Sequence, residues 1–250
     1  MKPEFFYMVN VVLASRLVYL FRDGPLTTGG LVFLLSVQTV GLLALQPGIS
    51  WAVLLGLLLV TGIAFHYLEK RQVLARSLRL VTLAVQIAVL SVFFSPLIGV
   101  SFNNDVISFL AGFGRYSILV SLVERFCRPE TGVVLMGGLL VANEANQLLR
   151  LMLGGLRVGP EAAAGKGGDL TPTGRREYNT GRVIGILERI IVYIAVMAGQ
   201  IAAIGFVLAV KGLARFKEMD HRPFAEYVLV GTLLSLLLAV SVAMLVKSLV

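Results

Sequence analysis

Cysteine and histidine are almost absent from the sequence. It contains one cysteine, Cys127, and two histidines, His66 and His221, among 250 residues. A single cysteine cannot form a disulfide within the chain, and two distant histidines do not make the cysteine and histidine cluster that holds a structural metal. The sequence therefore predicts no metal site and no cofactor.

Charged residues and catalytic motifs are also scarce. Charged side chains make up 14% of the chain, and neither the HExxH helix of zinc proteases nor the GxSxG turn of serine hydrolases occurs in it. We therefore predict no catalytic residues, and an enzyme is the least favoured class of protein.

Apolar residues fill the sequence instead, at 57% of the chain. They form runs of the length that a bilayer requires, about 17–25 residues each, and leave no block for a separate soluble domain. The sequence predicts an all-α fold, a polytopic membrane bundle of seven or eight segments in a single domain over residues 1–250. The predicted segments are about 5–21, 26–45, 49–68, 80–100, 106–126, 131–153, 183–207 and 225–246, with a flexible loop at 154–182.

The net charge of +8 comes from lysines and arginines at the ends of apolar segments and in short loops. There they orient helices and meet anionic lipid, so nucleic acid is not an expected partner. We expect a multi-pass protein of the bacterial cytoplasmic (inner) membrane that contacts membrane lipids, with a homo-oligomer or a membrane or cytosolic partner protein left open. Arg16, near the end of the first segment, is expected to reach the headgroups. The candidates for docking a partner or lipid are Lys70, Arg71, Arg76, Arg79, Lys211, Arg215 and Lys217.

The basic loops conflict with a simple count of crossings. If the connection at 69–79 is cytoplasmic, alternation places the loop at 157–182 outside, although its five lysines and arginines favour the cytoplasm. The seventh segment is also too long for one straight span, at about 50 Å against a hydrocarbon core of about 30 Å. Unless the loops violate the rule, we predict that this segment is kinked, interfacial or re-entrant. It would break near Gly199–Gln200 or Gly205, or continue as a surface helix from Lys211.

Polar side chains gather in the sixth and seventh segments. Helical spacing places those of each segment largely on one face, and unpaired charge in hydrocarbon is costly. We therefore expect the two faces to meet in a polar cleft, closed by a Glu144–Arg189 or a Glu188–Arg150 ion pair. The candidates for binding a substrate or an ion are Asn143, Glu144, Asn146, Gln147, Arg150, Glu188, Arg189, Tyr193 and Gln200.

Three interpretations of this cleft stay open. Its polar groups can lock helices together, bind a substrate or an ion, or support catalysis. The leading prediction is a transport protein, or a lipid- or small-molecule-binding protein, that uses the cleft between segments six and seven. The alternative is a non-transporting scaffold or sensor subunit that docks a cytosolic partner or anionic lipid. A water-filled cavity at Glu144 or Glu188 would favour the first, and a dry, fully paired interior would favour the second.

The stretch 181–235 contains three sequences in order, GRVIGILERI, AGQIAAIGFVLAVKGLARF and AEYVLVGTLLS. On these residues it resembles the C-terminal membrane region of a bacterial family known as domain of unknown function 3307. The resemblance covers about a fifth to a quarter of the chain. It implies a prokaryotic inner-membrane setting and no particular activity. The residues that it singles out for testing are Glu188, Arg189, Gln200, Lys211, Arg215, Glu226 and Tyr227.

Overall fold

The computed structural model describes most of the chain. The described residues are 2–20, 24–70, 75–106, 108, 129–155, 172–214 and 222–250. Within them the chain is helical, and the only extended pairing is an isolated bridge between Leu45 and Phe102. The predicted all-α class is confirmed. The segment predicted at 106–126 and most of the loop predicted at 154–182 lie outside the described residues.

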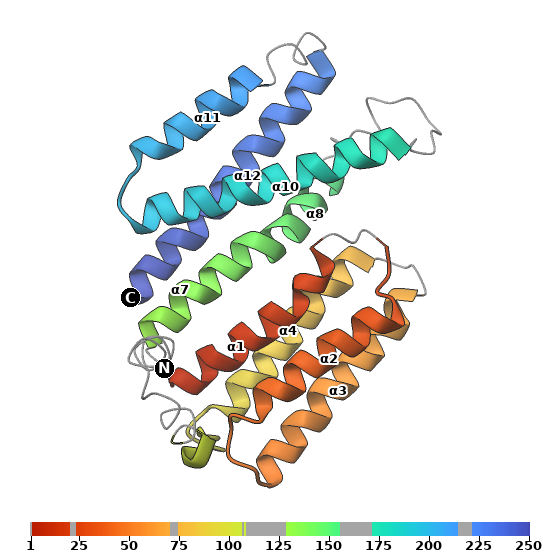
Figure 1. The fold of residues 1–250 in the computed structure, drawn as a ribbon, viewed down its shortest axis with the longest axis vertical. Helices are drawn as coiled ribbons and strands as arrows, with labels where there is room; N and C mark the ends of the chain where they lie inside the picture. Colours follow the sequence, from red (N-terminus) through yellow and green to blue (C-terminus); the bar gives the residue numbers. More distant parts are fainter. Residues whose placement is uncertain are drawn as a thin grey trace. The chain divides into compact units, whose positions relative to one another are not determined.

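The chain divides into two compact units, Met1–Leu139 and Leu140–Leu249. The first unit is a helical bundle in which α1 packs on α2, α4 and α7, and α3 packs on α2 and α4 (Figure 1). Its elements are α1 (Pro3–Ser15), the 3-10 turn η1 (Arg16–Tyr19), α2 (Thr28–Leu42), α3 (Ile49–Lys70), α4 (Ala75–Phe93) and α7 (Pro129–Leu139). The prediction of a single domain over 1–250 stays a prediction, since each unit is described by itself.

Close contacts in the first unit follow from small residues and from local hydrogen bonds. A side chain at Gly41 would overlap Val11, so the missing Cβ allows α2 to approach α1. Trp51 at the start of α3 donates its Nε1 proton to the Leu42 carbonyl at 2.8 Å. This bond closes the uncharged turn between α2 and α3, which pack together as the sequence predicts for segments two and three.

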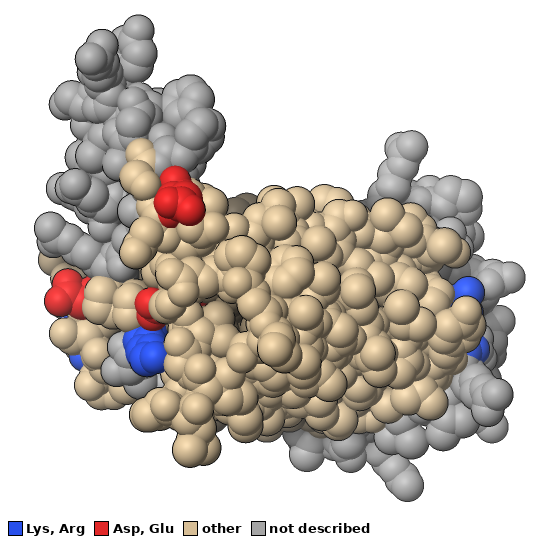
Figure 2. Space-filling view, turned by 90° about the horizontal axis from the view of Figure 1, so that it is seen from below, with Lys and Arg blue, Asp and Glu red and all other residues tan. Residues whose placement is uncertain are grey.

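Three described helices are long and apolar enough to cross a membrane, which indicates a membrane protein. They are Ile49–Lys70, Pro129–Leu153 and Val228–Leu249. Most of the face drawn in Figure 2 belongs to uncharged residues, as a bilayer requires. The expected count of seven or eight segments is not supported. The 15 residues of α2, for example, extend only about 22 Å, which is shorter than the hydrocarbon core.

The second unit is built around α10 and α12. These two helices pack on each other, and the π turn η3 and α8 pack against them. The elements are η3 (Leu140–Glu144), α8 (Ala145–Gly155), α10 (Pro172–Met197), α11 (Ala202–Ala214) and α12 (Arg222–Leu249). The helix α11 follows a sharp turn and folds back along α10 (Figure 1).

The turn between α10 and α11 is set by Gly199. Its φ of 73° lies in the left-handed region, which a residue with a side chain adopts at a cost. The Gly199 amide donates to the Val196 carbonyl at 3.0 Å, and the Gln200 amide donates to the Ala195 carbonyl at 2.8 Å. These bonds form a Schellman motif, the usual end of a helix at glycine. The break predicted near Gly199–Gln200 is confirmed, whereas Lys211 lies inside α11 and begins no separate surface helix.

Candidate functional site

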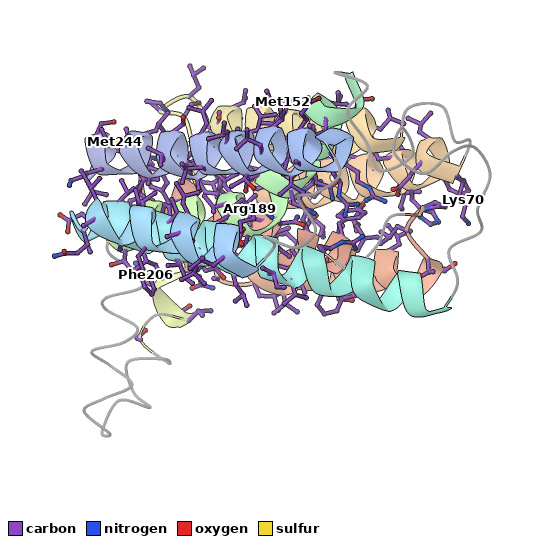
Figure 3. All side chains as sticks on the ribbon, turned by 90° about the horizontal axis from the view of Figure 1, so that it is seen from above. Lys70, Met152, Arg189, Phe206 and Met244 are labelled. Atoms are coloured by element: carbon purple, nitrogen blue, oxygen red, sulfur yellow. The ribbon has the colours of Figure 1, made fainter. Side chains whose placement is uncertain are left out.

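Arg189 is the central polar residue of the second unit (Figure 3). Its side chain is 3% exposed. Its Nε donates to the Val141 carbonyl of the π turn at 3.2 Å, and its Nη1 donates to the Ser235 hydroxyl of α12 at 3.4 Å. Its Nη2 has no hydrogen-bond partner within the described residues. Leaving a buried donor unsatisfied costs about 1–3 kcal/mol, and more when the group is charged. This nitrogen is therefore the clearest position for a ligand atom.

The π turn supplies part of the polar surroundings of Arg189. Such turns are rare, and they occur often at functional sites in membrane and soluble helices alike. In this turn the Asn143 amide donates to a Glu144 carboxylate oxygen at 2.9 Å, and both side chains are buried. The turn thus supplies Arg189 with a backbone carbonyl and contains a buried carboxylate that accepts from Asn143.

Glu188 and Lys211 form an ion pair at 2.5 Å between α10 and α11. Each side chain is 18% exposed, so the pair is only partly buried. The two residues lie at equal distances along the chain from the Gly199–Gln200 turn. The pair therefore joins matching levels of two antiparallel arms and closes a helical hairpin.

A small pocket of about 20 Å³ lies between α10, α11 and α12. This volume accommodates about one water-sized group. Glu188, Arg189 and Lys211 contribute charged side chains to its lining, and Thr232 and Ser235 contribute hydroxyl-bearing ones. The remaining lining residues are apolar. The pocket can hold a small polar group, and its lining offers more hydrogen-bond donors than acceptors.

The predicted binding residues differ in how far their side chains are buried within the second unit. Asn143, Glu144, Gln147, Arg189 and Tyr193 are buried in the second unit, as the polar cleft requires. In a second group the side chains are partly exposed: these are Asn146, Arg150 and Glu188.

Two details of the predicted cleft are wrong. Gln200 does not share a face with Arg189, because α10 ends at Met197 and Gln200 is exposed in the turn that follows. The predicted ion pairs do not form within the described residues. Glu188 pairs with Lys211 instead of Arg150, and the Arg189 guanidinium donates to a carbonyl and a hydroxyl rather than to Glu144.

The predicted docking residues also divide. Lys70 is exposed at the end of α3, but Arg79 is 5% exposed and lies inside the first unit. Arg79 therefore does not belong to an exposed basic face, and Lys211 is engaged by Glu188. The side chains of Arg71, Arg76, Arg215 and Lys217 lie outside the described residues. The docking role of these four and of Lys70 stays a prediction.

A buried ionic cluster in the first unit was not predicted. Arg79 donates to a Glu69 carboxylate oxygen from Nε at 2.7 Å and from Nη2 at 2.5 Å, and its Nη2 also donates to the Gly24 carbonyl at 2.7 Å. Arg16 donates to the Arg79 carbonyl at 2.8 Å, and both guanidinium groups lie over the Tyr19 ring. Arg16 is 1% exposed, so the expectation that it reaches the headgroups is wrong.

Sequence signals for the missed residues were weak. Glu69 is the only acid in the basic connection at 69–79, which marks it as a partner for a nearby arginine. Ser235 is one of several hydroxyl-bearing residues in a mostly apolar helix, a pattern that carries no information about its contacts. Its bond to Arg189 depends on how α10 and α12 pack, which local spacing does not determine.

Comparison with known proteins assigns no family to this site. No protein-family model matches the chain, and neither a curated protein nor a solved structure matches it. The resemblance of residues 181–235 to domain of unknown function 3307 stays a prediction. The described part of the chain also contains no group of three or more His, Cys, Asp or Glu residues that could hold a metal ion.

Proposed function

We propose that this membrane protein binds the anionic group of a lipid or small molecule in the pocket between α10, α11 and α12. The observation that carries the proposal is the Arg189 Nη2, a buried cationic donor that has no partner within the described residues. Guanidinium groups bind carboxylates and phosphates through charge-assisted hydrogen bonds, which are about twice as strong as neutral ones. An anionic oxygen in the pocket would complete the hydrogen bonding of Arg189.

The charge balance of the pocket supports the same proposal. Glu188 is engaged by Lys211, so the guanidinium of Arg189 forms no ion pair of its own within the described residues. A charge inside a bilayer is costly unless it meets an opposite charge or water. The lining is thus positive overall, and it favours an anion over a cation.

We also propose the bacterial cytoplasmic membrane as the location and a multi-pass arrangement. Three candidate spans support several crossings, and the resemblance at residues 181–235 supports the bacterial setting. Transport stays a prediction, because Arg189 and the pocket support binding only. The alternative of a scaffold with exposed basic faces has less support, since Arg79 and Lys211 are both engaged by carboxylates.

Ligand-dependent thermal stability tests the proposal. The purified full chain in an uncharged detergent would be mixed with inorganic phosphate, acetate, phosphatidylglycerol or phosphatidylcholine. We expect at least one anionic probe to raise the Tm by about 5 °C or more near saturation, since binding adds stability by mass action. Arg189→Gln should abolish this increase, and Lys247→Met, an exposed cation at the end of α12, should keep it.

A second variant, which retains the charge, keeps the test informative if Arg189→Gln does not fold. Arg189→Lys keeps a cation but cannot present the planar fork of a guanidinium. We expect a folded protein with a smaller ligand-dependent rise in Tm. The proposal is overturned if no anionic probe raises the Tm of the unaltered protein. It is also overturned if both Arg189 variants show a rise as large as that of the unaltered protein.

A further inference from the structure

The helix α11 has two different faces. Its inner face contributes Val207, Leu208 and Lys211 to the pocket. Its outer face is apolar and exposed, with Phe206 72% and Leu213 77% exposed. Figure 3 shows Phe206 pointing away from the second unit. The helix therefore forms a thin wall that has a cationic pocket on one side and a surface for hydrocarbon on the other.

Apolar surface continues on the other two helices that line the pocket. On α10, Leu187 precedes Glu188 and is 53% exposed. On α12, Leu233 and Leu237 lie next to lining residues and are 53% and 61% exposed. Exposed apolar side chains on the helices that line a polar pocket are typical of a site for a ligand that has both kinds of chemistry.

The size of the pocket limits how much of a ligand it can hold. A volume of about 20 Å³ takes about one oxygen atom of an anionic group, and the rest of any ligand must lie outside it. A soluble anion at this position would gain the contact with Arg189 but would also lose part of its hydration beside apolar side chains, which give it no hydrogen bonds in return. The acyl chains of a lipid would instead cover those side chains and gain contacts there.

We infer that the ligand is an anionic phospholipid, which enters sideways from the bilayer past α11 and places its phosphate oxygens on Arg189. This inference rests on the proposed anion site and adds the chemical class and the route. The Glu188–Lys211 ion pair holds α11 near the pocket, and the turn at Gly199 connects α11 to α10. The exposed apolar side chain of Phe206 on α11 would contact the acyl chains.

Lipid retention measured by native mass spectrometry tests this inference. The full chain in uncharged detergent would be offered equal amounts of phosphatidylglycerol and phosphatidylcholine. We expect about a 10-fold preference for phosphatidylglycerol, the size of one charge-assisted contact, and its loss in Arg189→Gln. Phe206→Gln should reduce retention severalfold, because it removes apolar surface on the route without touching the charged groups.

Met244→Gln is the matched control for Phe206→Gln. Met244 is 59% exposed on α12 and does not line the pocket, so its replacement should leave lipid preference unchanged. Equal loss of retention in the two variants would overturn the sideways route, and so would unchanged retention in Phe206→Gln.

Inorganic phosphate separates this inference from the proposed function. We expect it to produce no Tm increase at concentrations where phosphatidylglycerol does. An Arg189-dependent increase with phosphate and none with phosphatidylglycerol would overturn the lipid inference and keep the anion site. No increase with any anionic probe would overturn both.

Discussion

Both units bury an arginine among helices, and the two arginines have different partners. Arg79 in the first unit meets the Glu69 carboxylate, the Gly24 carbonyl and the Tyr19 ring. Arg189 in the second unit meets one carbonyl and one hydroxyl, and its Nη2 has no hydrogen-bond partner in the described part of the chain. A fully engaged charge holds a fold together, whereas an incompletely engaged one is available to a ligand. The comparison indicates that the cluster around Arg79 stabilises the fold and that the surroundings of Arg189 favour binding.

The largest expected effect comes from breaking the first cluster. Glu69→Gln leaves Arg79 buried without a carboxylate, and losing one partner of a buried pair costs about 3–5 kcal/mol. We expect a large fall in the Tm of the purified protein. Glu130→Gln, an exposed acid in the first turn of α7, should change the Tm little. Similar Tm values for the two variants would show that the cluster does not stabilise the first unit.

Arg189→Met should have a much smaller effect on stability without ligand. It removes two hydrogen bonds, but it also removes a buried charge that makes no hydrogen bond to a carboxylate among the described residues. These terms oppose each other, so we expect a change of about 1 kcal/mol or less. Arg79→Met, measured in the same way, should cost several times more because it strands Glu69. An equal loss of stability in Arg189→Met and Arg79→Met would contradict the view that Arg79 stabilises the fold and Arg189 does not.

A modest effect is expected at the turn of the hairpin. Gly199→Ala forces a side chain into the left-handed region, at a cost of about 1–2 kcal/mol. Gly205→Ala is the matched control, since Gly205 lies inside α11 and neither glycine has an atom near its missing Cβ. We expect Gly199→Ala to lower the Tm and Gly205→Ala to leave it unchanged or raise it. A raised Tm in Gly199→Ala would contradict the role of this turn.

Local sequence properties predicted part of this structure. Composition predicted helices in a membrane, and the excessive length of the seventh segment predicted its break at Gly199. The cost of burying charge predicted that Glu144 and Arg189 lie inside the second unit.

The partners of these charges could not be predicted in the same way. Lys211 reaches Glu188 only because α11 folds back, and a continuous helix would have placed it far away. Arg79 meets the Gly24 carbonyl across 55 residues of sequence. The expected number of spans is not supported within the described residues, because an apolar run in the sequence does not show that the whole run is helical. The helix α2, with 15 residues, occupies only part of the segment predicted at 26–45.

The turn at Gly199 also bears on how many times the chain crosses a bilayer. Glu188 and Lys211 lie at equal distances along the chain from this turn, so the stretch between them returns the backbone to the level at which it began. A stretch of this kind adds no net crossing, and we predict that the basic sequences at 157–182 and 211–222 lie on the same side of a bilayer, which would remove the conflict between their charges. Thiols placed by Gly168→Cys and Asp220→Cys, in a Cys127→Ser background, should therefore react from the same side. A single glycine in this way reverses the direction of the chain between α10 and α11.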